Sequence, residues 1–186
     1  MEINNAFDVP LPPAEAWKVL MDIPRIAPCM PGAELTEVVD ERTWKAKMSV
    51  KLGPISLAFG TDVTLDDVDE PSRVVRMSAK ARELRGRGAG TAAIESRLEP
   101  ADGGTTVSIV TDLALTGAVA QYGRGIVQDV SSQLVRRFAD CLEKQLVAAP
   151  EAAQAAVAES AKPVSGLSLG FGAVLRSLAR LFRRGS

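Results

Sequence analysis

The chain has 186 residues, enough for one well-packed domain and an appendage but too few for two ordinary domains. Its 46% hydrophobic and 24% charged residues are typical of a globular protein, and its formal net charge is −1. The basic residues are unevenly placed, because no acidic residue follows Ser160, whereas five basic residues do: Lys162, Arg176, Arg180, Arg183 and Arg184. The body is therefore acidic and would repel phosphate, which argues against a nucleic-acid-binding domain.

The N-terminal part predicts a strand followed by two short helical turns. Residues 2–9 form the predicted strand, and Pro12-Pro13 is suited to begin a helix. One face of that helix is apolar, with Ala16, Trp17, Leu20 and Met21. The pair Ile23-Pro24 ends it, and a second turn leads into the segment PCMPGAEL.

The next eighty residues have the alternating pattern of strands that bury one face. Turn residues separate the segments at Gly53-Pro54, at residues 69–72 and at residues 102–104, where a final hairpin is expected. The predicted inner-face residues are Trp44, Ala46, Met48, Val50 and Leu52, then Ile55, Leu57, Phe59, Val63 and Leu65, then Val75, Met77, Ala79 and Ala81.

The period changes near residue 119, and a long amphipathic helix is predicted from Val119 to about Val147. Its apolar positions include Ile126, Val130, Leu134, Phe138 and Leu142. The order of elements predicts an α+β fold in which a curved antiparallel sheet of about seven strands grips the last helix.

Targeting and redox signals are few. The N-terminus shows neither the basic nor the apolar region of a secretory signal, and no apolar run approaches the roughly 18 residues of a spanning helix. Cys29 and Cys141 lie far apart in unrelated contexts. We expect them to be buried free thiols, as in a cytosolic protein, rather than a disulfide or a reactive pair.

Residues 1–147 resemble the START/Bet v 1-like (SRPBCC) superfamily and, more narrowly, the CoxG family of carbon monoxide dehydrogenase subunits. The resemblance depends on Pro13, Trp17, Leu20 and Asp22, on residues 30–33 (MPGA), and on Tyr122-Gly123-Arg124 before the long helix. It implies a helix-grip fold that encloses an apolar cavity. It also implies an accessory role beside a molybdenum, flavin and iron-sulfur dehydrogenase, with recruitment to the membrane and electron transfer to quinone.

Several inner-face positions are small, and they have two interpretations. Small residues facing each other can let the helix approach the sheet closely, or they can leave a space that a ligand fills. We favour the second, with an apolar cavity lined by Met48, Leu57, Phe59, Met77, Ala79, Gly88, Gly90, Tyr122, Ile126 and Val130. Met30, Pro31 and Gly32 are expected at the cavity mouth or as a simple turn, and Arg124 at its rim or in a structural role.

The residues argue against catalysis by the chain itself. The absence of histidine removes the commonest general base and metal ligand, and no metal-binding spacing or nucleotide-binding motif appears. A quinone carrier needs none of these groups, because the redox chemistry belongs to the ligand.

The C-terminal residues differ from the body. Residues 148–166 have the composition of an Ala/Pro-rich flexible linker, partly able to form transient helix. Residues 167–186 predict an amphipathic basic helix that lies on an anionic membrane, with a groove on a partner protein as the alternative. Its predicted membrane-binding residues are Phe171, Val174, Leu175, Arg176, Leu178, Arg180, Leu181, Phe182, Arg183 and Arg184.

Together these features predict a membrane-attached, non-catalytic accessory protein on the cytoplasmic face of the cell membrane. We expect it to hold a non-covalent quinone, menaquinone in the first place or ubiquinone, for a carbon monoxide dehydrogenase-type enzyme. The alternatives are a tethering or maturation adaptor without a ligand and, third, a small-molecule cyclase or hydrolase.

Overall fold

The computed structural model describes residues 1–52 and 55–160, with side chains over residues 1–51 and 55–146. The chain divides into two units, Met1–Leu146 and Val147–Ser186, and the first holds the described strands. The predicted tail at residues 167–186 and the end of the predicted linker lie outside the described residues.

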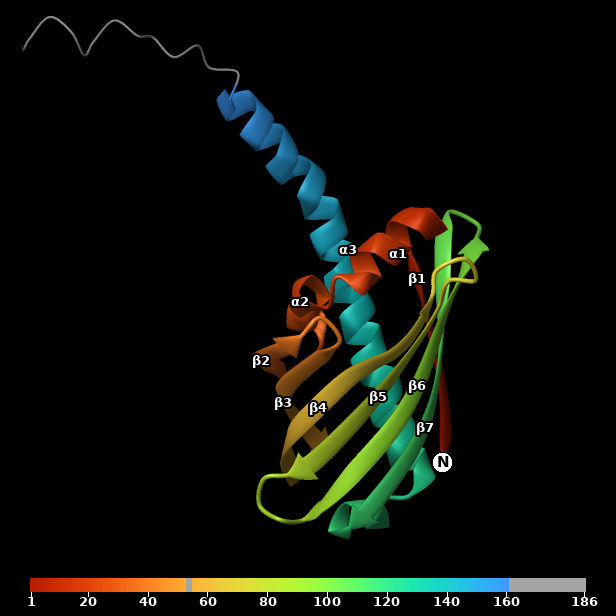
Figure 1. Cartoon of the computed structure of the whole chain (residues 1–186), viewed down its shortest axis with the longest axis vertical. Coiled ribbons are helices and arrows are strands. Elements are labelled where there is room, and N and C mark those ends of the chain that lie inside the picture. Colours follow the sequence, from red (N-terminus) through yellow and green to blue (C-terminus); the bar gives the residue numbers. More distant parts are fainter. Residues whose placement is uncertain (53–54, 161–186) are drawn as a thin grey trace, which may run out of the picture. The chain divides into compact units, whose positions relative to one another are not determined.

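Within the described residues, seven strands form one antiparallel sheet in the order β1-β7-β6-β5-β4-β3-β2 (Figure 1). Consecutive strands from β2 to β7 pair with each other, and β1 completes the sheet by pairing with β7. The strands are β1 (Glu2–Val9), β2 (Ala33–Asp40), β3 (Thr43–Leu52), β4 (Ile55–Asp69), β5 (Val74–Glu83), β6 (Gly88–Ala101) and β7 (Gly104–Gly117).

Short helical segments follow β1, and one long helix follows β7. Pro13 stands at the start of α1, where its missing N–H costs nothing, and the Asp22 carboxylate accepts the N–H of Arg25 (3.2 Å) at the start of α2. The segments are α1 (Pro13–Met21), α2 (Ile23–Ile26), the 3₁₀ turns η1 (Ala27–Cys29) and η2 (Ala118–Gln121), and α3 (Arg124–Ser160).

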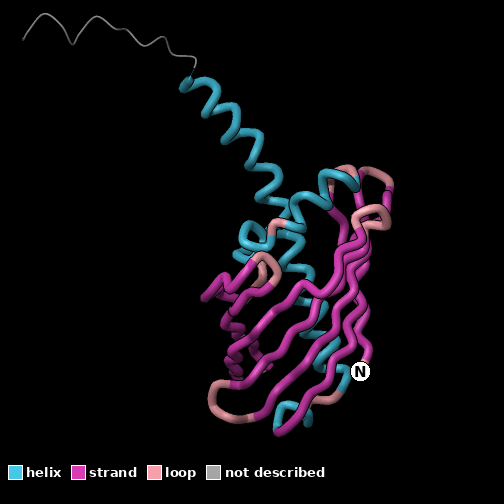
Figure 2. Tube along the Cα trace, viewed as in Figure 1, coloured by secondary structure: helices cyan, strands magenta, loops and turns pink. Residues whose placement is uncertain are grey.

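The predicted α+β helix-grip fold is confirmed. The strands curve around the part of α3 that belongs to the first unit, and Figure 2 shows this helix against one face of the sheet. Phe7 of β1 meets Phe138 of α3 edge to face, with ring centroids 5.5 Å apart. Leu142, one turn further along, is 1% exposed and joins the same core.

The helix differs from its predicted limits at both ends. Residues 118–121 form a 3₁₀ turn, Tyr122 is extended (φ −74°, ψ 103°), and α3 therefore begins at Arg124 instead of Val119. At the other end α3 continues to Ser160, so residues 148–160 of the predicted linker are helical. Alanine is abundant there, and alanine has the highest helix propensity.

The prediction of free thiols is wrong, because Cys29 of η1 and Cys141 of α3 form a disulfide. Their Cα atoms lie 5.3 Å apart, inside the range that a disulfide bridges. The bridge spans 112 positions of sequence, so only the packing of η1 against α3 brings the two sulfurs together.

The turn between β5 and β6 contains a buried acid. The Glu83 side chain is 5% exposed, and its Oε2 accepts the backbone N–H groups of Arg85 (2.8 Å) and Arg87 (3.1 Å). Burial raises the pKa of this carboxyl, but the backbone N–H groups outweigh that effect and hold the pKa below its usual value of 4.5. Glu83 therefore replaces missing backbone partners inside the turn.

Candidate functional site

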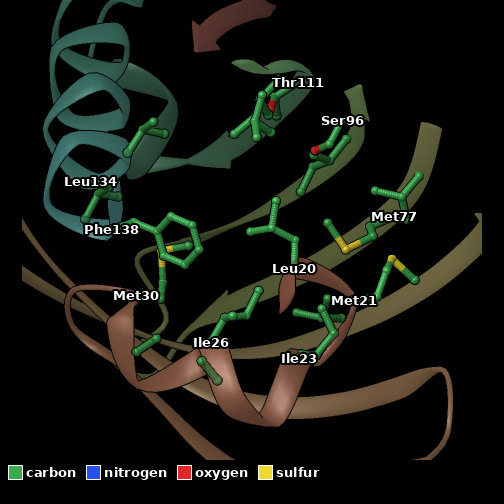
Figure 3. A pocket seen from close by; sticks show the side chains of 18 of the residues that line it. Leu20, Met21, Ile23, Ile26, Met30, Met77, Ser96, Thr111, Leu134 and Phe138 are labelled. Carbon is green, nitrogen blue, oxygen red and sulfur yellow. The ribbon is translucent and has the colours of Figure 1, made fainter. Parts of the chain in front are cut away.

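A cavity of about 390 Å³ lies between the sheet, the α1–η1 segment and α3. Figure 3 shows side chains from all three entering it. The helical segments contribute Trp17, Leu20, Met21, Ile23, Ile26, Ala27 and Met30 from α1–η1 and the residue after it, and Ser131, Leu134, Val135 and Phe138 from α3.

The local sequence explains why these side chains meet. In α3 the lining residues recur at intervals of three and four, which places them on one face of the helix. In the sheet they recur at intervals of two, as in Ile94, Ser96 and Leu98 of β6. Pairing carries the same face across the strands, because Ser96 lies opposite Val75 and Ile94 lies opposite Met77.

The lining is almost entirely apolar. Its polar side chains, apart from the indoles of the tryptophans, are Asn5, Ser96, Thr111 and Ser131, and no charged or titratable side chain of the described residues lines it. Such a cavity cannot hold an unpaired charge cheaply, because nothing in its wall replaces the lost hydration. It suits a neutral, largely apolar molecule.

One wall residue contains an unusual polar atom. The Trp44 indole Nε1 is buried and has no hydrogen-bond partner among the described residues, and the same holds for Thr61 Oγ1 on the inner face of β4. The described residues contain no group of three or more Cys, Asp or Glu side chains placed to hold a metal ion.

The structure places the predicted cavity residues on the expected face of the sheet but mostly at the other end of it. Met77 lines the cavity, and so does Met30, which was predicted at its mouth. Leu57 is buried in the opposite half of the sheet, and Ile126 is 48% exposed. The remaining predicted residues are half-buried and lie outside this lining: Met48, Phe59, Ala79, Gly88, Gly90, Tyr122 and Val130.

The glycines of β6 show why small residues misplaced the cavity. Gly88 has φ +141°, and a methyl group there would overlap the Thr116 carbonyl oxygen. A Cβ at Gly90 would lie 3.1 Å from the Leu115 side chain. At these two positions the small residues allow close approach of β7 and its side chains, which is the other interpretation of the pattern.

The remaining predicted positions have structural contacts. Gly32 has φ +77° and forms the turn expected of residues 30–32, while Pro31 is half-buried beside it. Arg124 Nη2 donates to the Glu2 carbonyl oxygen (3.0 Å) and so joins the start of α3 to β1. Which of the predicted residues contact a ligand stays a prediction.

The sequence argument missed most of the wall that α1, α2 and η1 provide. The apolar face of α1 was visible in the sequence, and Leu20 and Met21 of that face do line the cavity. Their role was hidden because the sequence alone does not show whether that face covers a filled core or an open space.

Residues 6–147 match the family model described as a carbon monoxide dehydrogenase subunit (CoxG). The chain belongs to the CoxG family. The comparison with curated proteins gives no match for this CoxG-family chain.

Solved structures confirm the Bet v 1-like fold. A conserved protein from Geobacillus kaustophilus is 20% identical with a TM-score of 0.70, and the match covers 79% of this chain and 95% of that one. Ara h 8.0201 is 17% identical with a TM-score of 0.55, covering 80% and 98%. The ZhuI aromatase/cyclase from Streptomyces sp. R1128 is 15% identical with a TM-score of 0.54, covering 80% and 94%.

Proposed function

We propose that this CoxG-family chain carries a lipophilic quinone in its cavity as an accessory protein of a carbon monoxide dehydrogenase-type enzyme. The observation that carries the proposal is the 390 Å³ cavity, which is lined by apolar residues and no described charged side chain. Its volume is at the lower end of the range for small-molecule sites, so it suits a ring system and the first part of an apolar chain.

The family supplies the proposed partner. CoxG proteins are described as a subunit of carbon monoxide dehydrogenase, and the proposed enzyme contains molybdenum, flavin and iron-sulfur centres. Menaquinone is the first candidate ligand and ubiquinone the second. A bound quinone would accept the electrons itself, so the protein needs to supply only binding and orientation.

The proposed role is non-catalytic. The fold does not decide this, because a neighbour of the same fold is named as an aromatase/cyclase. Support comes from the family's description as part of an enzyme and from a cavity wall without a titratable side chain. A tethering or maturation adaptor with an empty cavity is the alternative.

Native mass spectrometry of the gently purified full-length chain tests the ligand. We expect an added mass that matches an isoprenoid quinone. Ala46→Phe, which places a phenyl ring in the cavity wall, should reduce its occupancy, while Ala79→Phe on the same inner face outside the lining should not. A wild-type protein that consistently purifies without a lipophilic ligand and binds no added quinone would favour the adaptor.

Membrane attachment is the second part of the proposal. None of the described helices is both long and apolar enough to cross a bilayer. We assign attachment to residues 167–186, whose arginines would each contribute on the order of 1 kcal/mol at an anionic surface. Deleting these residues should abolish pelleting with phosphatidylglycerol vesicles, and the intact chain should pellet poorly with phosphatidylcholine vesicles. Pelleting that survives the deletion would contradict the assignment.

The proposed location is the cytoplasmic face of the cell membrane. The Cys29–Cys141 disulfide argues against a strongly reducing compartment, because such compartments keep most thiols reduced. Alkylation of thiols in intact cells before lysis tests this directly. A disulfide that is already oxidised in the cell would count against the cytoplasmic location.

A further inference from the structure

The cavity has a polar wall and an apolar wall. The polar side chains Asn5, Ser96, Thr111 and Ser131 come from β1, β6, β7 and α3, which are far apart in the sequence. The side chains from α1 to η1, such as Leu20, Ile23 and Ile26, are apolar. Figure 3 shows Ser96 and Thr111 near one another, away from Ile23 and Ile26.

Strand pairing explains why the polar residues gather. Asn5 and Ser96 both lie opposite Ile109 of β7, so they occupy one row across three strands. Thr111 follows Ile109 on the same face of β7, in the next row. The polar wall is therefore a small area of the inner sheet at β1, β7 and β6.

Asn5 is held in place by the helix. Its Nδ2 donates to Ser131 Oγ (2.7 Å), and its Oδ1 accepts from Ser132 Oγ (3.1 Å). Gln128 Nε2 donates to Ser132 Oγ (3.2 Å) and to the Asn4 carbonyl oxygen (3.2 Å). These bonds fix the helix side of the polar wall before any ligand arrives.

The sheet side of the polar wall is different. Ser96 is 8% exposed and lines the cavity, yet neither its hydroxyl nor that of Thr111 has a hydrogen-bond partner among the described side-chain bonds. Buried hydroxyl groups normally have a partner, because leaving one without a partner costs free energy. Two such hydroxyls facing one cavity are donors ready for an acceptor on a ligand.

We propose that Ser96 and Thr111 bind the oxygen of a neutral carbonyl head group, with the ligand's apolar body directed toward Leu20, Ile23 and Ile26. This inference rests on the proposed function and adds the orientation and chemical class of the ligand. A carboxylate or phosphate head does not fit, because the described wall offers no cation to pair with it.

Two probes of similar shape test the head-group contact on the full chain. One is 2-methyl-1,4-naphthoquinone, and the other is 2-methylnaphthalene, which has the same carbon skeleton without the oxygens. Trp17 and Trp44, the two tryptophans of the chain, both line the cavity, so their fluorescence reports quinone binding. The hydrocarbon is then measured as a competitor of the quinone.

We expect the quinone to bind more tightly than the hydrocarbon. Ser96→Ala and Thr111→Val should each raise the Kd for the quinone roughly twofold to tenfold, the usual effect of losing one neutral hydrogen bond. The Kd for the hydrocarbon should stay within twofold. Ser108→Ala on the outer face of β7 is the matched control and should change neither value.

The outcomes separate this inference from the proposed function. Equal affinity for the two probes, or variants that leave the quinone Kd unchanged, would overturn the head-group contact and leave the carrier role standing. Failure of the wild-type chain to bind either probe would overturn both. Palmitate binding as tightly as the quinone would contradict the preference for a neutral head. Thermal melts of each variant confirm that the fold is intact before titration.

Discussion

Breaking the Cys29–Cys141 disulfide should destabilise the domain strongly. The bridge joins η1 to α3 beside two residues of the cavity wall, because Cys29 lies next to Met30 and Cys141 follows Phe138 by one helical turn. The perturbation is either reduction with dithiothreitol or the double variant Cys29→Ala/Cys141→Ala.

The magnitude follows from the length of chain that the bridge closes. For a separation of 112 residues, the loss of loop-closure entropy in the unfolded chain corresponds to about 5 kcal/mol. Measured losses on removing native disulfides are about 2–5 kcal/mol, so this value is an upper limit. For a domain of this size, we expect the melting temperature to fall by roughly 5–15 °C.

Thermal unfolding followed by circular dichroism, with and without dithiothreitol, measures the effect. The double variant is the control, since its melting temperature should be low and should not respond to the reductant. Thiol titration of the unreduced, denatured wild type should find no free thiol. Two free thiols, or an unchanged melting temperature after complete reduction, would refute the reasoning.

Three further predictions concern the first unit. Gly32→Ala should cost roughly 1–3 kcal/mol in urea unfolding, because the residue has φ +77° and a methyl group would overlap the Ser49 carbonyl oxygen; Gly86→Ala, at φ +76° with open space, should cost less. Glu83→Gln should destabilise at pH 7, and the gap from wild type should narrow as the pH falls below about 4.5, because the folded-state pKa lies below that value and its stabilising effect is lost on protonation. A gap independent of pH would refute this. Leu142→Ala should cost about 2–5 kcal/mol, because the side chain is 1% exposed, and a loss below 1 kcal/mol would contradict its place in the core.

The sequence carried most of the information about the fold. Alternation in β3 and β5 identified the inner face correctly, since Trp44, Ala46, Val75 and Met77 all line the cavity. The hairpin at residues 102–103 and the final helix were also correctly predicted. These features depend on neighbours within a few positions of the chain, which is why a single sequence shows them.

The position of the cavity depended on contacts that the sequence does not show. A period of two distinguishes the faces of a strand but not its ends, so Met77 was placed correctly while Phe59 and Gly90 were not. Small residues misled the prediction because Gly88 is small for its neighbour on β7 rather than for a ligand.

The sequence by itself determined the order of the elements, the buried face of each strand and the apolar stripe of the helix. Tertiary structure alone decided which end of the sheet stays open, which hydroxyls face the cavity and that Cys29 meets Cys141. The physical reason is separation along the chain. These features arise where η1, β6, β7 and α3 converge, and no local pattern encodes how distant segments pack.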